Sequence, residues 1–129
     1  YRALHGAIRG GLVQSAHDLS EGGLAVALAE MCLAGRLGAQ VELEPLLQGA
    51  GLTVVEALFA ESNGRLLVEV AEGDAAAFEA ALAGTAVARI GTVKAADELI
   101  ISAGSGREQQ PLLAVAVDEL VAAWKGEGA

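Results

Sequence analysis

Apolar residues recur along the chain at two spacings, one typical of helices and one typical of strands. Apolar positions three and four residues apart predict a helix, because such residues share one helix face. Helices are expected near residues 4–12, 21–33, 53–59, 74–84 and 117–124. Alternating or continuous apolar runs predict strands at residues 13–16, 39–43, 65–70, 87–93 and 99–102.

This mixture of elements predicts an α+β domain, in which helices pack on a mainly antiparallel sheet. Residues 65–102 in particular follow the order strand, helix, strand, strand. A polar loop is expected at residues 104–110, before the last helix. The pattern leaves open whether helices cover one face of the sheet or both.

The helix expected at residues 21–33 is apolar on nearly every side. Glu30 alone interrupts its apolar run, so this helix is expected to be covered almost all round. Cys32 lies in the same run and is the only cysteine. A single cysteine forms no intrachain disulfide, and it is expected to be a small buried residue in a reducing, cytoplasmic protein.

Composition limits the kind of core and the number of domains. The 129 residues predict a single domain over 1–129. Alanine supplies 28 residues, glycine 17, and aromatic residues only 3%. The core is therefore expected to consist of Leu, Val and Ile, with backbones that approach closely.

The charge balance excludes two classes of partner. The chain has 17 acidic and 8 basic residues and a net charge of −9. Nucleic acids and anionic membranes both bind basic surfaces, so neither is an expected partner. No apolar run approaches the roughly 18 residues of a membrane-spanning helix.

The strongest candidate site is the segment 17–23, at the start of the helix expected at 21–33. Its sequence places two glycines in a first helical turn, where each costs about 1 kcal/mol relative to alanine. The free N–H groups of a helix start attract anions, and glycine allows an anion to approach closely. The candidate phosphate- or ligand-binding residues are His17, Asp18, Ser20, Gly22 and Gly23.

Each polar side chain of this segment has a candidate role. Ser20 is suited to cap the helix or to donate to a phosphate, and Asp18 to hold a metal or a ligand hydroxyl. His17 is suited to donate to a phosphate or to orient Asp18. The alternative is purely structural, since serine often precedes a helix.

A weaker candidate is the turn sequence at 61–65, which joins a helix to a strand. Glu61, Ser62 and Arg65 form either an ordinary turn or a loop that lines a site. The chain contains no phosphate-loop motif, no nucleophile elbow and no Cys/His metal spacing. Neither a catalytic residue nor a metal site is therefore predicted, and this chain alone is not expected to hydrolyse ATP.

Four strings of the sequence carry a family resemblance. They are SAHDLSEGGLAVALAEM at 15–31, LFAESNGRLLVEV at 58–70, ARIGTV at 88–93 and DELVAAW at 118–124. Together they resemble phosphoribosylformylglycinamidine synthase, a synthetase of purine biosynthesis. The first string also resembles, more loosely, a superfamily that includes aminoimidazole ribonucleotide synthetase, selenophosphate synthetase and thiamine-monophosphate kinase. The combination with the second string is more specific to the first enzyme.

The resemblance implies a fold, a reaction and partners. The implied fold is the last C-terminal domain of the synthetase, an α/β/α layered domain that is partly ferredoxin-like. The implied enzyme uses ATP and magnesium to convert formylglycinamide ribonucleotide to its amidine, with ammonia from a glutaminase subunit or domain. The remaining synthetase domains are the other implied partners, and they carry most of the ATP and magnesium contacts. The resemblance implies that the segment 17–23 faces a phosphate.

The resemblance also implies a missing piece. Domains of this family begin roughly forty residues earlier, with a strand that is absent here. An open sheet edge would allow self-association, so a homodimer is a further expectation. Two alternatives stay open: the C-terminal domain of another superfamily member such as aminoimidazole ribonucleotide synthetase, and a ferredoxin-like ligand-binding module.

Overall fold

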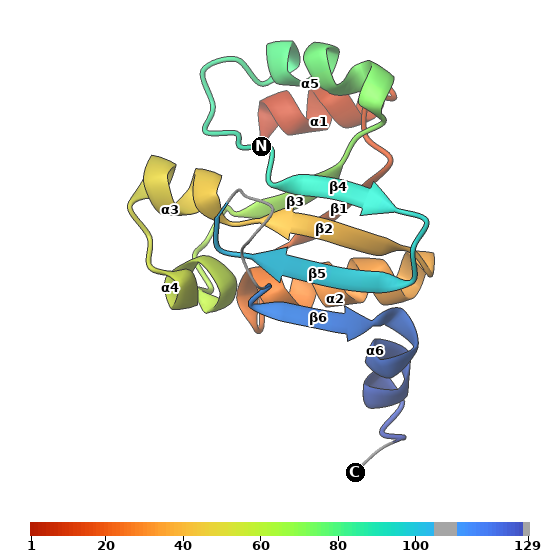
Figure 1. Ribbon diagram of the computed structural model, residues 1–129. Coiled ribbons are helices and arrows are strands. Elements are labelled where there is room, and N and C mark those ends of the chain that lie inside the picture. The colour runs from red at the N-terminus through yellow and green to blue at the C-terminus, as the bar shows by residue number, and fades with distance from the viewer. Residues whose placement is uncertain (105–110, 128–129) are drawn as a thin grey trace.

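The computed structural model describes residues 1–104 and 111–127, which form six helices and six short strands (Figure 1). The helices are α1 (Arg2–Arg9), α2 (Gly23–Gly35), α3 (Glu44–Ala50), α4 (Val54–Phe59), α5 (Ala75–Ala81) and α6 (Val117–Trp124), with a 3-10 turn at Glu72–Asp74. The strands are β1 (Ser15–Asp18), β2 (Gly38–Glu42), β3 (Leu66–Glu69), β4 (Gly91–Lys94), β5 (Glu98–Ser102) and β6 (Leu113–Ala116).

The strands form two separate sheets. One has four strands in the order β4-β2-β5-β6, and the other consists of β1 and β3 alone. Among the strands of the described residues, only the β2–β5 pair is parallel, while the β1–β3, β2–β4 and β5–β6 pairs are antiparallel. The predicted α+β class with mainly antiparallel pairing is thus confirmed, with two sheets in place of the single one expected.

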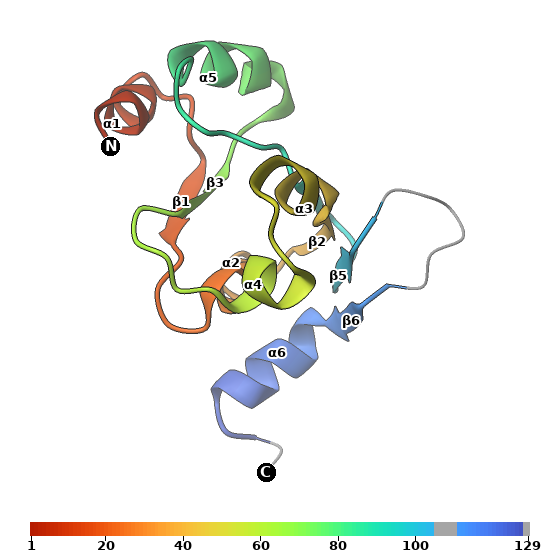
Figure 2. The ribbon, with the colours of Figure 1, turned by 90° about the vertical axis from the view of Figure 1, so that its left-hand side faces the viewer.

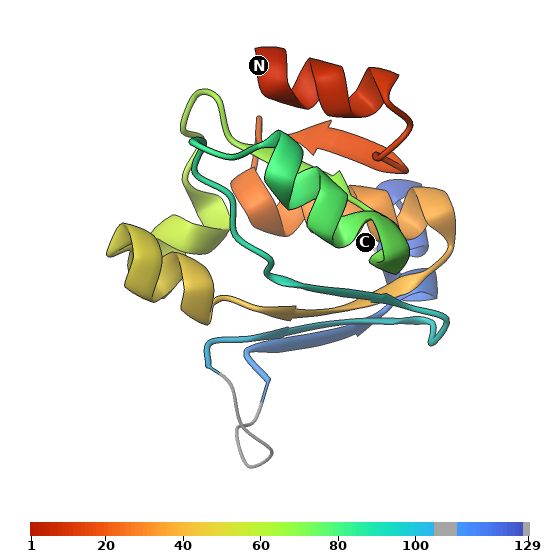
Figure 3. The same cartoon turned by 90° about the horizontal axis from the view of Figure 1, so that it is seen from above.

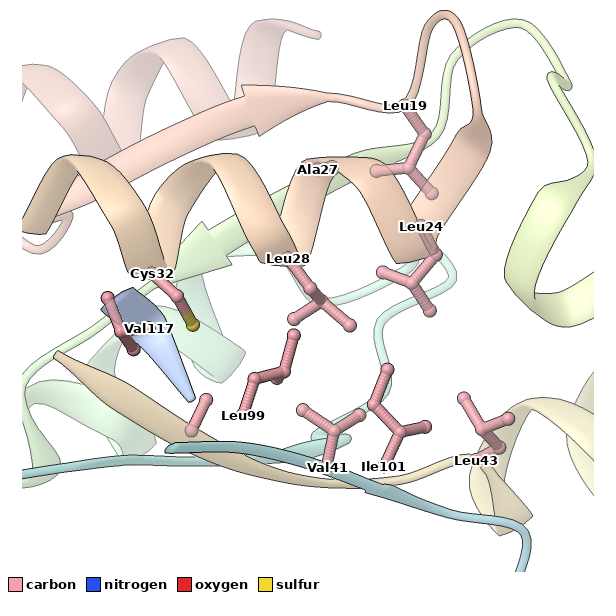
Figure 4. Packing of buried hydrophobic residues seen from close by; sticks show 11 residues of the cluster. Leu19, Leu24, Ala27, Leu28, Cys32, Val41, Leu43, Leu99, Ile101 and Val117 are labelled. Atoms are coloured by element: carbon pink, nitrogen blue, oxygen red, sulfur yellow. The ribbon is translucent and has the colours of Figure 1, made fainter. Parts of the chain in front are cut away.

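Helix α2 lies between the two sheets, and this position explains why its sequence is almost entirely apolar. Its residues Leu24, Leu28 and Cys32 point toward Leu99 and Ile101 of β5 (Figure 4). Its other side contacts β1 and β3. A helix covered from both sides must be apolar around most of its circumference, as its sequence is. Cys32 is buried as predicted. We call α2, α6 and the four-stranded sheet the sheet region.

A second, smaller cluster lies between α1, α5 and the β1–β3 pair. Ala7 of α1 packs with Phe78 of α5 and with Leu82, and Val68 of β3 adds to this cluster. Figure 2 shows α1 and α5 together, with β1 and β3 running from them toward α2. Figure 3, seen from above, places α1 and β1 on the side of α2 that faces away from β5. We call α1, α5, β1 and β3 the ribbon region.

Several element boundaries differ from the predicted ones. The first strand lies at Ser15–Asp18, two residues beyond the predicted 13–16, because pairing with β3 fixes its register. Helix α3 forms between the predicted strand at 39–43 and the predicted helix at 53–59, where no element was predicted. Pro45 lies in its first turn, where a missing N–H costs nothing. The strand predicted at 87–93 forms only in its last part, as β4. Strand β6 was not predicted.

The last two predicted segments have different outcomes. Helix α6 has the bounds that its apolar spacing predicts. Residues 105–110 of the polar loop predicted at 104–110 lie outside the described residues. Among residues 1–104 and 111–127, no helix combines the length and apolarity needed to cross a membrane.

Candidate ligand-binding segment

The segment 17–23 is split between a strand and a helix start. His17 and Asp18 end β1, so they are held by strand pairing and do not lie in a free loop. Helix α2 begins at Gly23, and its N-cap is Gly22 in the left-handed conformation. The suggestion that Ser20 caps this helix is therefore wrong. Ser20 is exposed in the short connection between β1 and α2.

The two sequence-predicted segments meet in space. The Gly22 N–H donates to Oε1 of Glu61 at 2.9 Å, and the Leu19 N–H donates to the Arg65 carbonyl at 3.1 Å. A carboxylate thus binds the helix start at a position where an anion was predicted. The preference of this helix start for negative charge is satisfied here by a side chain of the protein itself.

Gly23 has a packing role that the sequence did not reveal. A Cβ atom at this position would lie 2.8 Å from the Leu58 carbonyl oxygen and 2.9 Å from the carbonyl carbon of Phe59. Its φ of +63° also lies in the left-handed region. Glycine therefore allows the start of α2 to touch the end of α4, which accounts for this residue without a ligand.

Arg65 stabilises the end of α4. Its guanidinium donates to the carbonyls of Ala57 and Ala60, each at 3.1 Å. These carbonyls lie in the last turn of α4 and at its C-cap, where a cation is favoured by the helix dipole. Ser62 lies in the exposed turn that precedes Arg65. The Arg65 guanidinium thus makes hydrogen bonds that stabilise the fold.

His17 bridges β1 and α2. Its Nδ1 lies 2.6 Å from the Asp18 carbonyl oxygen, and its Nε2 lies 2.6 Å from Oε2 of Glu30. The hydrogen bond with Asp18, together with that to Glu30, raises the pKa of His17 above its usual 6.5, although partial burial acts in the opposite direction. The Asp18 carboxylate is largely exposed, with Oδ1 3.6 Å from Nδ1.

Glu30 and its surroundings have no role predicted from the sequence. Glu30 and His17 line a groove of about 620 Å³ between β1, α2 and α6, together with Ser15, Glu69 and Trp124. Ser15 donates its hydroxyl to Glu69 at 2.7 Å. The sequence did carry a signal, since Glu30 is the one charged residue of an apolar helix. Its partner lies 13 positions away on a strand, beyond the reach of helical spacing.

No metal centre is formed by the described part of the chain. Residues 1–104 and 111–127 contain no group of three His, Cys, Asp or Glu side chains arranged to hold a metal ion. Cys32 is buried, and burial raises the pKa of its thiol, with a smaller contribution from Glu69. A raised pKa keeps the thiol protonated, which is the less reactive form.

The class of this domain follows from the match to a family model. Residues 1–104 match the family described as AIR synthase related protein, C-terminal domain, and the chain belongs to that family. Strand β6 and helix α6 lie beyond the matched residues.

Curated relatives narrow the resemblance further. The chain is 45% identical over 123 residues to phosphoribosylformylglycinamidine synthase subunit PurL of Synechococcus elongatus, which covers 92% of the chain. It is 43% identical over 126 residues to the PurL of Synechococcus strain JA-2-3B'a(2-13). The sequence-based resemblance to this synthase is thereby confirmed. In both comparisons the chain spans only 15% of the relative's length.

Solved structures confirm the fold. PurL of Thermotoga maritima complexed with ATP matches with a TM-score of 0.76 and 23% identity, over 92% of this chain and 20% of that one. The same protein complexed with FGAR matches with a TM-score of 0.75 and the same identity and coverage. Hydrogenase maturation protein HypE in complex with ATP gives a TM-score of 0.64 at 20% identity, over 88% of this chain and 39% of that one.

Proposed function

We propose that this chain is the last C-terminal domain of a phosphoribosylformylglycinamidine synthase. The observation that carries this proposal is the 45% identity to a PurL subunit over 92% of the chain. The proposed parent enzyme is an ATP-dependent carbon–nitrogen ligase of purine biosynthesis. It converts formylglycinamide ribonucleotide to formylglycinamidine ribonucleotide with ammonia derived from glutamine. The relatives named PurL favour this reading over another superfamily member or a ferredoxin-like ligand-binding module.

ATP and magnesium are the proposed cofactors of the parent enzyme. The described residues of this chain do not form a site for magnesium. The described residues contain no cluster that would hold a metal ion, so the magnesium ligands are proposed to lie in the remaining synthetase domains. A glutaminase subunit or domain is the proposed ammonia source, and the proposed location is the cytoplasm. Neither nucleic acid nor membrane is a proposed partner, given the net charge of −9.

Within the parent, the proposed role of the segment 17–23 is to face a phosphate. Support comes from the start of α2, where the Gly22 N–H already binds a carboxylate. A phosphate at this position would have to displace Glu61, which lies in the exposed turn after α4. His17, Asp18, Ser20 and Gly23 are the other proposed ligand-binding residues, and Ser62 and Arg65 remain weaker candidates.

A domain exchange tests the proposed function. In PurL of Synechococcus elongatus, the matching 15% of the subunit would be replaced by this chain, and amidine formation from formylglycinamide ribonucleotide, ATP and ammonia would be measured. We expect turnover by the chimera and none by the 129-residue chain alone. A matched control carries the homologous segment of the Synechococcus JA-2-3B'a(2-13) enzyme. An inactive chimera beside an active control would contradict the proposal.

The domain and assembly proposals concern the ribbon region. We propose that residues 1–129 form one domain. In the described part of the chain, β1 and β3 pair only with each other, so each keeps an unpaired edge. A second copy is the proposed occupant of such an edge. Light scattering should show a homodimer at high protein and salt concentration, and a strict monomer throughout would contradict this.

A further inference from the structure

Both ring nitrogens of His17 face oxygen atoms that only accept hydrogen bonds. One is the backbone carbonyl of Asp18 and the other is the carboxylate of Glu30, each at 2.6 Å. A neutral imidazole has a single N–H and satisfies one of these acceptors, whereas the imidazolium has two and satisfies both. The geometry of the two contacts therefore favours the charged form of His17.

Three of the elements around His17, β1, α2 and β3, contribute acidic residues. Asp18 lies beside it on β1, Glu30 faces it from α2, and Glu69 of β3 lines the same groove while accepting a hydrogen bond from Ser15. Helix α6 contributes Trp124, which is uncharged. Among the described residues that line this groove, none is a lysine or arginine. Among the described residues of this lining, His17 is therefore the one side chain that can carry a positive charge.

His17 joins the end of β1 to the second turn of α2. Its Nδ1 contact fixes the backbone at Asp18, directly before the connection begins. Its Nε2 contact reaches Glu30, which lies seven residues after the first residue of α2. The contact with Glu30 thus ties the end of β1 to α2 across the connection that contains Ser20 and Gly22. Loss of this contact removes one of the ties on that connection, beside the hydrogen bonds of Leu19 and Gly22.

We infer that His17 and Glu30 form a pH-dependent fastening, in which the imidazolium ties β1 to α2 and stabilises the connection between them, and its deprotonation weakens this tie. Glu30 acts as a positioning residue through His17. The direction follows from linkage. The pKa of His17 is raised in the folded chain, so the fastening is complete below pH 6.5. It is lost as the pH rises through the raised value. This inference does not depend on the proposed function.

Nitrogen NMR of the histidine rings in the 129-residue chain tests the charge state directly. His5→Gln identifies the His17 signals, since the chain has only two histidines. We expect both His17 nitrogens to be protonated at pH 6.5 and the titration midpoint to lie above that pH. Glu30→Gln should lower the midpoint, and Glu79→Gln, a charge loss on α5, should not. A midpoint at or below 6.5 in the unaltered chain would overturn the inference, even if Glu30→Gln does not fold.

Amide hydrogen exchange tests the weakening of the tie between β1 and α2. The Leu19 N–H, bonded to the Arg65 carbonyl, reports on it after correction for the intrinsic pH dependence of exchange. We expect its protection factor to fall about tenfold between pH 6 and pH 9, which corresponds to about 1.4 kcal/mol. In Glu30→Gln it should be low at both pH values, and in Glu79→Gln it should behave as in the unaltered chain. Protection that is the same at both pH values would contradict the fastening.

Discussion

The sheet region and the ribbon region differ in how much apolar surface they bury. Among the described residues, the cluster around α2 and the four-stranded sheet contains eleven buried side chains, and the cluster of the ribbon region contains three. A pair of strands without further neighbours is marginally stable in water. The ribbon region therefore depends on α2, whose side facing away from β5 contacts β1 and β3.

This difference indicates that the two regions open at different free energies. Local unfolding begins where few apolar contacts hold an element in place. We expect the ribbon region to open first and the sheet region to require global unfolding. The segment 17–23 lies at the junction, because it begins in β1 and ends in α2. Its shape is thus set by both regions.

The largest expected effect comes from a large side chain of the sheet region. Leu99 of β5 is 1% exposed, and Leu99→Ala should lower the free energy of global unfolding by about 2–5 kcal/mol through lost burial and a residual cavity. Urea unfolding measures this loss. Val55→Ala on α4 is the control, since Val55 is 66% exposed, and it should change the free energy little. Equal effects of the two substitutions would refute this account of the core.

A second substitution tests whether the regions are separable. Phe78→Ala removes the largest side chain of the ribbon cluster. It should lower the free energy of opening the ribbon region by about 3 kcal/mol, at the low end of the range for buried Phe. Hydrogen exchange should accelerate in α1, α5 and β3 and stay slow in β5. Uniform acceleration over both regions would show a single cooperative unit and would remove the distinction.

The smallest expected effect concerns the junction. Gly23→Ala places a Cβ against the backbone of Leu58 and Phe59, at a positive φ, and should destabilise the chain by about 1–3 kcal/mol. Gly49→Ala in α3 is the matched control, because a Cβ there meets nothing within 4 Å. That control should be neutral or stabilise by up to about 1 kcal/mol. Thermal denaturation distinguishes the two.

The sequence predicts the elements whose signals are local. Helix α4 begins after Thr53, whose hydroxyl and Glu56 cap each other's backbone N–H groups, a motif readable at a spacing of three. Strand β6 was missed because its apolar residues run directly into the apolar start of α6, with no polar residue to separate them. Helix α3 was missed as well, because it contains Gly49 and glycine disfavours a helix.

The candidate site was predicted in its residues but not in its contacts. The segment 17–23 and Glu61 were both singled out, yet their hydrogen bond joins positions 39 residues apart. The pair formed by His17 and Glu30 depends on how β1 lies against α2. Neither contact follows from spacing along one element, because each needs the packing of two elements that the sequence does not align.

The parallel pairing of β2 with β5 has a consequence for how the chain folds. Ala39 and its partner Leu99 lie sixty positions apart, and β3 and α5 of the ribbon region occupy part of the chain between them. A loop of that length must close before the centre of the larger sheet exists, so high contact order is built into the topology. Folding should therefore be slower than for a helical bundle of equal length. The interleaved order also means that no single cut of the chain separates the two regions.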